Sequence, residues 1–254
     1  MEHRGQCIAV VSGKGGTGKT SFTAGVGAAL ALSGRRVLCL DCDIGLRNLD
    51  LALGLSDRTL MDFSDVAQNR CSLDLAAVEH PKIPGLFLLT APARLRGRPV
   101  TEAQMTALLQ EVRRRYDFCL LDAPAGLGTG FQLATCRADR CVVVTTADAS
   151  SLRDAQHTVM ELNRFPAGAL HLVVNRVRKK LLRQLQICAD LVQRHIASQD
   201  TGQEDLRNLW HTLVEFLWGK SPGRNRYCQF NSSLLQSFRI KFVYCIPLSP
   251  WVPF

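Results

Sequence analysis

Long apolar runs are absent from this sequence of 254 residues. No stretch approaches the roughly 18 to 20 uninterrupted apolar residues that a helix needs to cross a bilayer. The opening residues, MEHRGQCIAVVS, lack the longer hydrophobic core of a secretory signal. We therefore expect a cytoplasmic protein. Because 46% of its residues are hydrophobic, the chain can bury the core of one sizeable α/β domain, with or without an appendage.

The ten cysteines lack the pattern of a disulfide framework or a zinc site. Several lie inside apolar runs such as CIAVV, VLCL and CVVV, where cysteine behaves as a small buried hydrophobe. Cys39 and Cys42 have C-x-x-C spacing, but no second pair with matching spacing follows. On a strand their side chains would point to opposite faces. We interpret the cysteines as reduced.

Internal repeats are also absent, and the chain has a formal charge of +9 with three local arginine-rich clusters. These clusters are RLRGR, RRR at residues 113–115 and RVRKKLLR. Such clusters are mostly solvated faces, but nucleic acid or an anionic membrane surface are alternative partners.

Short apolar runs alternate with helical patterns over the first two thirds of the chain. We expect strands at CIAVVS, RVLCLD, GLFLLTA, DFCLLDA, RCVVVTT and LHLVVN, and helices over residues 20–33, 101–115 and 150–164. Near-continuous apolar strands separated by helices predict an α/β fold, with a mostly parallel sheet covered by helices on both faces. Ligands bind such a sheet beyond the carboxyl ends of its strands.

The chain changes character near Gln186. Ten of its 17 aromatic residues, including all three tryptophans, lie in the last 68 positions. The segment SPGRNRYCQFNSS is typical of a loop. We therefore divide the chain into a domain over residues 1–186 and an atypical C-terminal segment, residues 187–254, whose structure we do not predict.

The stretch SGKGGTGKTS, from Ser12 to Ser21, contains the phosphate-binding pattern G-x-x-x-x-G-K-[ST] between a predicted strand and a predicted helix. Backbone N–H groups of a glycine-rich loop and the N-terminus of the following helix favour phosphate oxygens. In this pattern Lys19 reaches the β- and γ-phosphates and Thr20 offers its hydroxyl to Mg²⁺. The predicted nucleotide-binding residues of the loop are Gly13, Lys14, Gly15, Gly16, Thr17, Gly18, Lys19, Thr20 and Ser21.

Three aspartates follow predicted strands and complete the expected site. Asp122, in FCLLDAPAG, fits a Walker B carboxylate that holds Mg²⁺; the alternative is a strand-end aspartate that caps a turn. Asp41 and Asp43, in LDCDIGLRNLD, follow the second strand. One of them can orient the attacking water while the other supports the metal shell, because Mg²⁺ offsets the repulsion between nearby carboxylates.

Four motifs, KGGTGKTS, DCDIGLRNLDLALG, LLDAPAG and TTADASSLRDA, together resemble the MinD group of deviant Walker A ATPases, which are related to ParA partition proteins and the nitrogenase iron protein. The resemblance covers roughly residues 6–186 and implies a P-loop NTPase of the SIMIBI type. It makes Lys14 the signature lysine, Asp43 the water-positioning residue, Asp41 its neighbour in the first switch and Asp122 the Walker B residue.

The same resemblance implies roles at the edge of the site. Asn175 matches the asparagine that contacts adenine, with Arg176 beside it. The implied dimer and partner surface contains Arg47, Asn48, Arg153 and Asp154. Lys14 lies too early in the loop to replace Lys19, so the resemblance places its ammonium on the phosphates of a second copy. The alternative is a solvated loop lysine.

The resemblance further implies a Mg²⁺-dependent ATPase that places the division septum. ATP would bring two chains together, and the homodimer would bind a MinC-like division inhibitor and the anionic inner face of the cell membrane. A MinE- or DivIVA-like regulator would stimulate hydrolysis and release. The alternatives are a ParA-like or flagellar-number ATPase acting on DNA or cargo, and a nucleotide-binding protein inactivated by its C-terminal segment.

The C-terminal end departs from the family. The segment SFRIKFVYCIPLSPWVPF has only Arg239 and Lys241 as cations and contains three prolines, so it cannot form the long basic amphipathic helix by which the family binds membranes. YCIPLSP is compatible with a remnant of the last strand and loop. Residues 187–254 are either genuine divergence or the product of a shifted reading frame, which translation of the other frames would distinguish.

Overall fold

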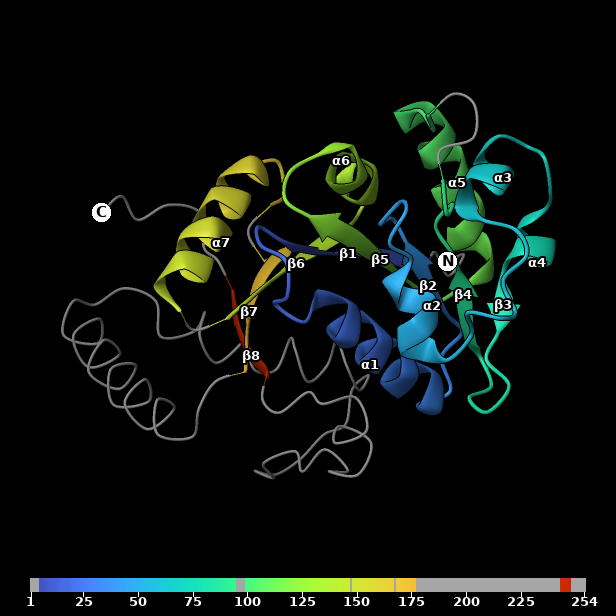
Figure 1. The fold of residues 1–254 in the computed structure, drawn as a ribbon, viewed down its shortest axis with the longest axis horizontal. Coiled ribbons are helices and arrows are strands. Elements are labelled where there is room, and N and C mark those ends of the chain that lie inside the picture. Colours follow the sequence, from blue (N-terminus) through green and yellow to red (C-terminus); the bar gives the residue numbers. More distant parts are fainter. Residues whose placement is uncertain (1–4, 95–98, 147, 167, 177–242, 248–254) are drawn as a thin grey trace.

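The computed structural model describes residues 5–94, 99–146, 148–166, 168–176 and 243–247. They form one eight-stranded sheet in the order β3-β4-β2-β5-β1-β6-β7-β8, with helices packed on both faces (Figure 1). The six inner strands are parallel to their neighbours, while β3 and β8 pair antiparallel at the two edges. The predicted mostly parallel sheet with helices on both faces is confirmed.

The predicted elements are found close to their expected bounds. The strands are β1 (Gln6–Ser12), β2 (Val37–Asp41), β3 (Val78–Glu79), β4 (Leu86–Leu89), β5 (Phe118–Ala125), β6 (Arg140–Thr146), β7 (Leu170–Asn175) and β8 (Val243–Pro247). The helices are α1 (Lys19–Leu32), α2 (Asn48–Leu53), α3 (Phe63–Ala67), α4 (Leu73–Ala76), α5 (Glu102–Arg115), α6 (Thr129–Thr135) and α7 (Ala149–Glu161). The sequence did not predict the short elements α2, α3, α4, α6 and β3.

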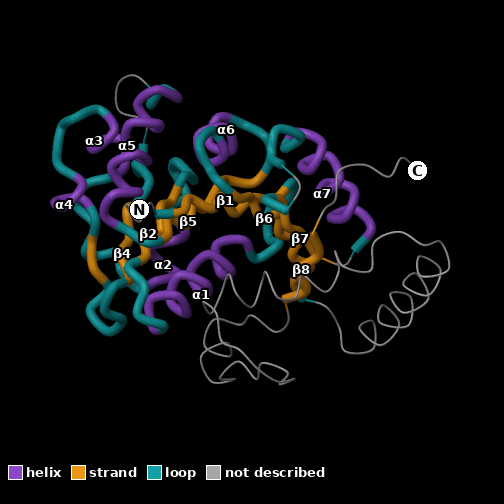
Figure 2. Tube along the Cα trace, turned by 180° about the vertical axis from the view of Figure 1, so that it is seen from behind, coloured by secondary structure: helices purple, strands orange, loops and turns teal. Residues whose placement is uncertain are grey.

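Two layers of buried side chains cover the two faces of the sheet. Helices α1 and α2 pack on one face, and α3 to α7 pack on the other (Figures 1 and 2). Successive residues of a strand contribute to opposite layers, as the alternation of side chains requires. Cys39 belongs to the layer with α1 and Cys42 to the layer with α5, which confirms that these two thiols point to opposite faces. The free thiols are Cys7, Cys39, Cys42, Cys71, Cys119, Cys136 and Cys141.

The carboxyl ends of the central strands bring the predicted site together. Strand β5 lies between β1 and β2. Because the three strands are parallel, the loop that leaves β1 lies at the same edge of the sheet as the carboxyl ends of β5 and β2. Asp41, the last residue of β2, and Asp122, in the second half of β5, are register partners. Two carboxylates from distant parts of the sequence therefore lie side by side at the edge where ligands bind parallel sheets.

The C-terminal segment contributes strand β8, which pairs antiparallel with β7. This strand overlaps YCIPLSP, the stretch compatible with a remnant of the last strand. The predicted boundary at Gln186 lies outside the described residues, so the division into two parts stays a prediction. None of the helices in the described ranges is long and apolar enough to span a membrane.

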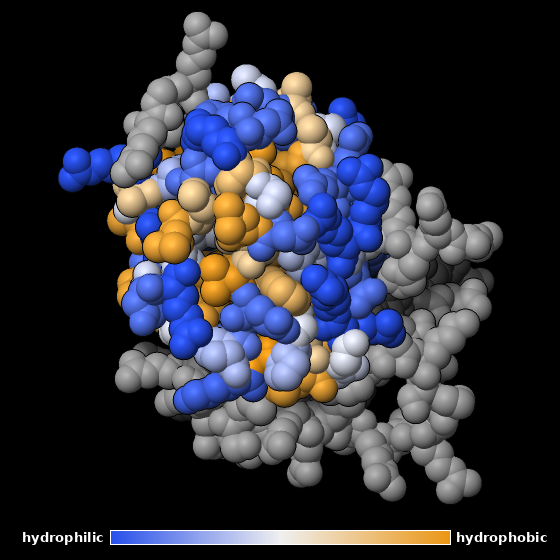
Figure 3. All heavy atoms as spheres, turned by 90° about the vertical axis from the view of Figure 1, so that its right-hand side faces the viewer, coloured by the Kyte–Doolittle hydropathy of each residue, from blue (hydrophilic) through white to orange (hydrophobic). Residues whose placement is uncertain are grey.

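Charged and apolar areas alternate on the face that carries α3 and α4 (Figure 3). Of the three arginine-rich clusters, only residues 113–115 are fully described, and two of their side chains make internal contacts. Arg113 is buried, pairs with Asp139 and donates to the carbonyl of Arg137 at 2.6 Å. Arg115 pairs with Asp74 and Glu111. This cluster therefore does not form a freely solvated basic patch.

Candidate nucleotide-binding site

The phosphate-binding loop connects β1 to α1 and is clamped between two other elements. Gly18 has a left-handed φ of 92°, and a Cβ at this position would lie 2.2 Å from the amide nitrogen of Asn175 on β7. A Cβ on Gly13 would lie 2.5 Å from the carbonyl oxygen of Asp154 on α7. Both close approaches require glycine. Contacts with residues that are distant in the sequence therefore require glycine at these two positions of the loop.

The start of α1 is suited to an anion. The helix has 14 residues and no side chain caps its N-terminus, so its first N–H groups remain available. Gly15 and Gly16 of the preceding loop are exposed, and nothing lies within 4 Å of a Cβ built on either residue. Thr20 and Ser21 occupy the first turn and are partly buried. Free N–H groups, the helix dipole and the open loop are the features that favour an anion such as phosphate.

Beneath the loop lies a buried polar group centred on Asp122. Lys19 is 8% exposed, and its Nζ lies 3.4 Å from Asp122 Oδ1. The hydroxyl of Thr23 donates to the same oxygen at 3.3 Å. The sequence analysis missed Thr23, although a hydroxyl one helical turn after Lys19 lies on the same face of α1.

Asp122 itself fits a cation ligand. It is 1% exposed, and its Oδ2 has no hydrogen-bond partner among the described residues. Burial raises the pKa of Asp122, and the charge of Lys19 opposes that rise. A buried carboxylate oxygen without a partner is costly unless a charge or a hydrogen bond compensates it. Mg²⁺, which prefers oxygen ligands, would supply that compensation with the nearby Thr20 hydroxyl.

Asp41 uses both carboxylate oxygens to hold the segment that follows β2. Its Oδ1 accepts the N–H of Asp43 at 2.8 Å and its Oδ2 accepts the N–H of Leu49 at 3.2 Å. Burial raises the pKa of Asp41 to about 7, while the N–H of Asp43 lowers it. Burial also raises the pKa of the half-buried Asp43, against the charge of Lys19. The metal role of Asp41 and the water-positioning role of Asp43 stay predictions.

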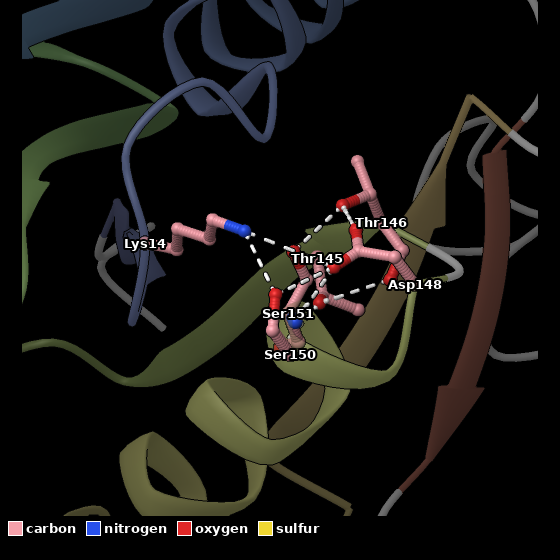
Figure 4. Close-up of polar contacts among 6 residues, drawn as sticks. All are labelled: Lys14, Thr145, Thr146, Asp148, Ser150 and Ser151. Atoms are coloured by element: carbon pink, nitrogen blue, oxygen red, sulfur yellow. Dashed lines mark hydrogen bonds and ion pairs between the residues drawn. The ribbon is translucent and has the colours of Figure 1, made fainter.

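Lys14 points toward the beginning of α7 (Figure 4). Its Nζ donates to Ser150 Oγ at 2.9 Å and lies 3.8 Å from Asp148 Oδ1. Asp148 caps α7 by accepting the N–H of Ser151 at 3.0 Å. Hydrogen bonds from Thr146, Ser151 and Ser150 hold the pKa of Asp148 well below its usual range. In this state Lys14 is therefore bound within its own chain.

Sequence analysis missed Asp148 and Ser150 as partners of Lys14. An aspartate three residues before Ser151, at the start of a helical pattern, is an N-cap signal that could have identified the turn. Nothing in the sequence could have shown that Lys14 reaches this turn, because the two positions are 134 to 136 residues apart.

Asn175 lies under the phosphate-binding loop. Its Nδ2 donates to the carbonyl of Thr17 at 2.9 Å, and its Oδ1 accepts the N–H of Arg176 at 2.8 Å. The side chain is buried, whereas Arg176 is exposed at the end of β7. Asn175 thus supports the loop, and its contact with adenine stays a prediction.

The residues expected at a dimer or partner surface lie on two helices on opposite faces of the sheet. Asn48 and Arg153 are exposed, while Asp154 is half-buried against the loop. The side chain of Arg47 instead turns inward and contacts Asp50. The structure therefore brings together the residues predicted to bind phosphate and metal, and the dimer and partner surface stays a prediction.

Comparison with known proteins gives consistent matches. A family model described as an AAA domain matches residues 5–168. The septum site-determining protein MinD of Synechocystis sp. is 39% identical over 180 residues, which cover 71% of this chain and 68% of that protein. The MinC:MinD cell division protein complex of Aquifex aeolicus is 34% identical with a TM-score of 0.62, covering 70% of this chain and 72% of that chain. MinD of Pyrococcus horikoshii complexed with Mg-ADP is 29% identical with a TM-score of 0.56, covering 66% and 67%.

Proposed function

This chain belongs to the MinD family of septum site-determining proteins, which carry an AAA domain, and from that premise we propose that it is an ATP-hydrolysing dimerisation switch in cell division. It binds ATP with Mg²⁺ and releases ADP and phosphate. The observation that carries the proposal is the buried group of Lys19, Thr23 and Asp122 beneath an uncapped helix N-terminus. The Lys19 ammonium and the free N–H groups of α1 suit a triphosphate, and the unpartnered Asp122 Oδ2 suits its metal ion.

The residues of the loop bind and orient the triphosphate. Lys19 moves its ammonium from Asp122 toward the β- and γ-phosphate oxygens, and N–H groups of α1 donate to the phosphates. Thr20 and Asp122 would hold Mg²⁺, which would neutralise negative charge on the phosphates. Asp43 orients the attacking water, and the N–H bond to Asp41 keeps Asp43 at the edge of the site.

Lys14 acts on the nucleotide of a second copy. For this it must leave Ser150 and Asp148, and the cost is small because the side chains of Lys14 and Asp148 are about half exposed. In the dimer its ammonium stabilises charge that develops on the transferred phosphoryl group. Hydrolysis then requires two chains.

The partners follow from the relatives. The MinC:MinD complex of Aquifex aeolicus supports a MinC-like division inhibitor as a partner. We also propose a MinE- or DivIVA-like regulator and a cytoplasmic location; peripheral association with the inner face of the cell membrane is implied for the family. Because the family's basic helix is not recognisable in this sequence, we expect weak sedimentation with anionic liposomes even with ATP. Tight ATP-dependent sedimentation would contradict this.

The direct test is turnover as a function of protein concentration. We expect the rate of ATP hydrolysis per chain to rise with concentration until the chain is dimeric, and to vanish when EDTA removes Mg²⁺. Light scattering should give a monomer with ADP and a dimer with a non-hydrolysable ATP analogue. A rate per chain that is constant over a hundredfold range below the dimerisation constant would refute the switch. Salt-sensitive binding of DNA by the ATP state would favour the ParA-like alternative.

A further inference from the structure

The segment between β2 and α2, residues 42–47, carries Asp43, and Arg47 fixes its end next to α2. Arg47 occupies the N-cap position of α2 with a left-handed φ of 48°. Its Nη2 donates to Asp50 Oδ2 at 3.0 Å and to Thr59 Oγ1 at 2.6 Å. The guanidinium thus joins the start of α2 to the chain that follows this helix.

These contacts are difficult to replace. Asp50 is 4% exposed, and its Oδ1 has no partner within the described part of the chain. Removal of Arg47 alone would leave a buried carboxylate without a countercharge. A left-handed backbone at a residue other than glycine also persists only where its surroundings hold it. The ion pair with Asp50 and the bond to Thr59 therefore determine the backbone conformation at Arg47.

The backbone of Arg47 is connected directly to Asp43. The N–H of Arg47 donates to the carbonyl of Asp43 at 3.3 Å, while the N–H of Asp43 donates to Asp41 Oδ1 at 2.8 Å. Asp43 is thus held on one side by the end of β2 and on the other by Arg47. Between these two points the N–H of Gly45 donates to the carbonyl of Pro92 at 3.1 Å, while Leu46 is largely exposed, so Arg47 provides the side-chain contacts at the end of the segment nearest α2.

We propose that Arg47 is a positioning residue for ATP hydrolysis. Through its contacts with Asp50 and Thr59 it fixes the backbone that aims the Asp43 carboxylate. The inference rests on the proposed role of Asp43 in orienting water. It gives Arg47 an internal role that needs no partner protein, and it predicts that loss of this role changes turnover more than nucleotide affinity.

The decisive variant replaces both charges, Arg47→Met with Asp50→Leu, so that no buried charge remains unpaired. The matched control is Arg58→Met, an exposed arginine in the segment after α2. In the nucleotide-free full chain, hydrogen exchange of peptides covering residues 42–49 should be at least about tenfold faster in the double variant. Exchange in β1 should be unchanged, and the control should match the wild type. Unchanged exchange over residues 42–49 would overturn the proposal.

Kinetics then separate positioning from stability. In the double variant kcat should fall about tenfold or more, while the Kd for Mg·ATP stays within about threefold. The fall should disappear when Asp43→Ala is also present, because both changes act through the same carboxylate. Thr59→Val keeps the ion pair between Arg47 and Asp50 and should lower kcat by about threefold. Arg47→Lys, with Asp50 retained, should lower kcat less than the double variant does, since a lysine keeps the charge without the planar fork.

The outcomes are distinguishable from those of the proposed function. A wild-type chain without ATPase activity would contradict the proposed function, and the exchange measurement would still decide whether Arg47 fixes the segment. Full turnover in a double variant whose exchange is accelerated would refute the positioning role alone. Full additivity with Asp43→Ala would also refute it.

Discussion

The two lysines of the phosphate-binding loop lie in opposite environments. Lys19 is 8% exposed and contacts the buried Asp122, whereas the Lys14 side chain is 47% exposed and contacts Ser150. The first belongs to the floor of the site, defined here as Lys19, Thr23 and Asp122. The second belongs to its rim, defined as Lys14, Asp148 and Ser150. Buried charged groups lose a partner only at a high cost unless another charge takes its place, while exposed groups can exchange partners at little cost.

This difference separates binding from assembly. The floor is complete within one chain and is suited to hold a nucleotide in the monomer. The rim lysine makes contacts that are weak enough to be given up when a second chain approaches. Substitutions at the two lysines should therefore have different consequences, although the residues lie five positions apart in one loop.

Lys19→Ala should have the largest effect. We expect kcat/KM for ATP to fall by about 10⁴-fold, because a charge-assisted phosphate contact is lost in binding and again in the transition state. Calorimetry should show affinity for Mg·ATP weakened by roughly 100-fold. Lys14→Ala is the matched control, since it should leave affinity of the monomer unchanged. Equal affinity of Lys19→Ala and wild type would mean that the floor does not hold the phosphates.

Lys14→Ala should have the next largest effect, on turnover. We expect about a 10³-fold fall in kcat and no ATP-induced dimer by light scattering, because a cation supplied from a second chain is lost. Lys82→Ala, an exposed lysine before β4, is the control and should behave as wild type. A Lys14→Ala chain that still dimerises and hydrolyses ATP normally would show that the rim lysine is only a solvated residue.

Asp43→Ala tests whether turnover can be lost while nucleotide binding and dimer formation persist. Turnover should fall by about 10²-fold while ATP binding and the dimer persist, since the positioned water is lost but the phosphate contacts remain. Single-turnover kinetics with light scattering on the same sample would measure both. Asp57→Ala, an exposed carboxylate after α2, provides the comparison. Turnover that persists would assign the water to another residue.

Ser150→Ala should have the smallest effect and the opposite sign. The substitution removes the hydroxyl that accepts the hydrogen bond of Lys14 but leaves Asp148 to cap α7. Freed from this contact, Lys14 should reach the second chain more easily, so the ATP dimer should tighten by about two- to threefold. Analytical ultracentrifugation with a non-hydrolysable analogue measures the change. A weaker dimer would indicate that Ser150 supports the interface instead of competing with it.

Much of the fold was accessible from sequence because its signals are local. Six apolar runs and three long helical patterns predicted the inner strands and the helices α1, α5 and α7. The short elements α2, α3, α4, α6 and β3 were missed because a helix or strand of a few residues carries too little periodicity. Their stability comes from caps and packing, such as the box in which Asp62 and Asp65 cap α3.

The candidate site divides in the same way. The spacing of Gly13, Gly18, Lys19 and Thr20 is a local pattern, so the sequence alone determined the phosphate-binding loop and its strand and helix context. The placement of Asp41 beside Asp122 was also predictable, because the carboxyl ends of parallel strands meet at one edge.

Only the tertiary structure decided which partners these residues have. Asn175 supports Thr17, Lys14 binds Ser150, and Arg47 turns inward to Asp50 and Thr59. Two of these contacts join positions more than 130 residues apart, and the third depends on the path of the chain after α2. The physical reason is that residue type sets what a side chain can bind, whereas burial and the packing of distant elements determine which group it meets.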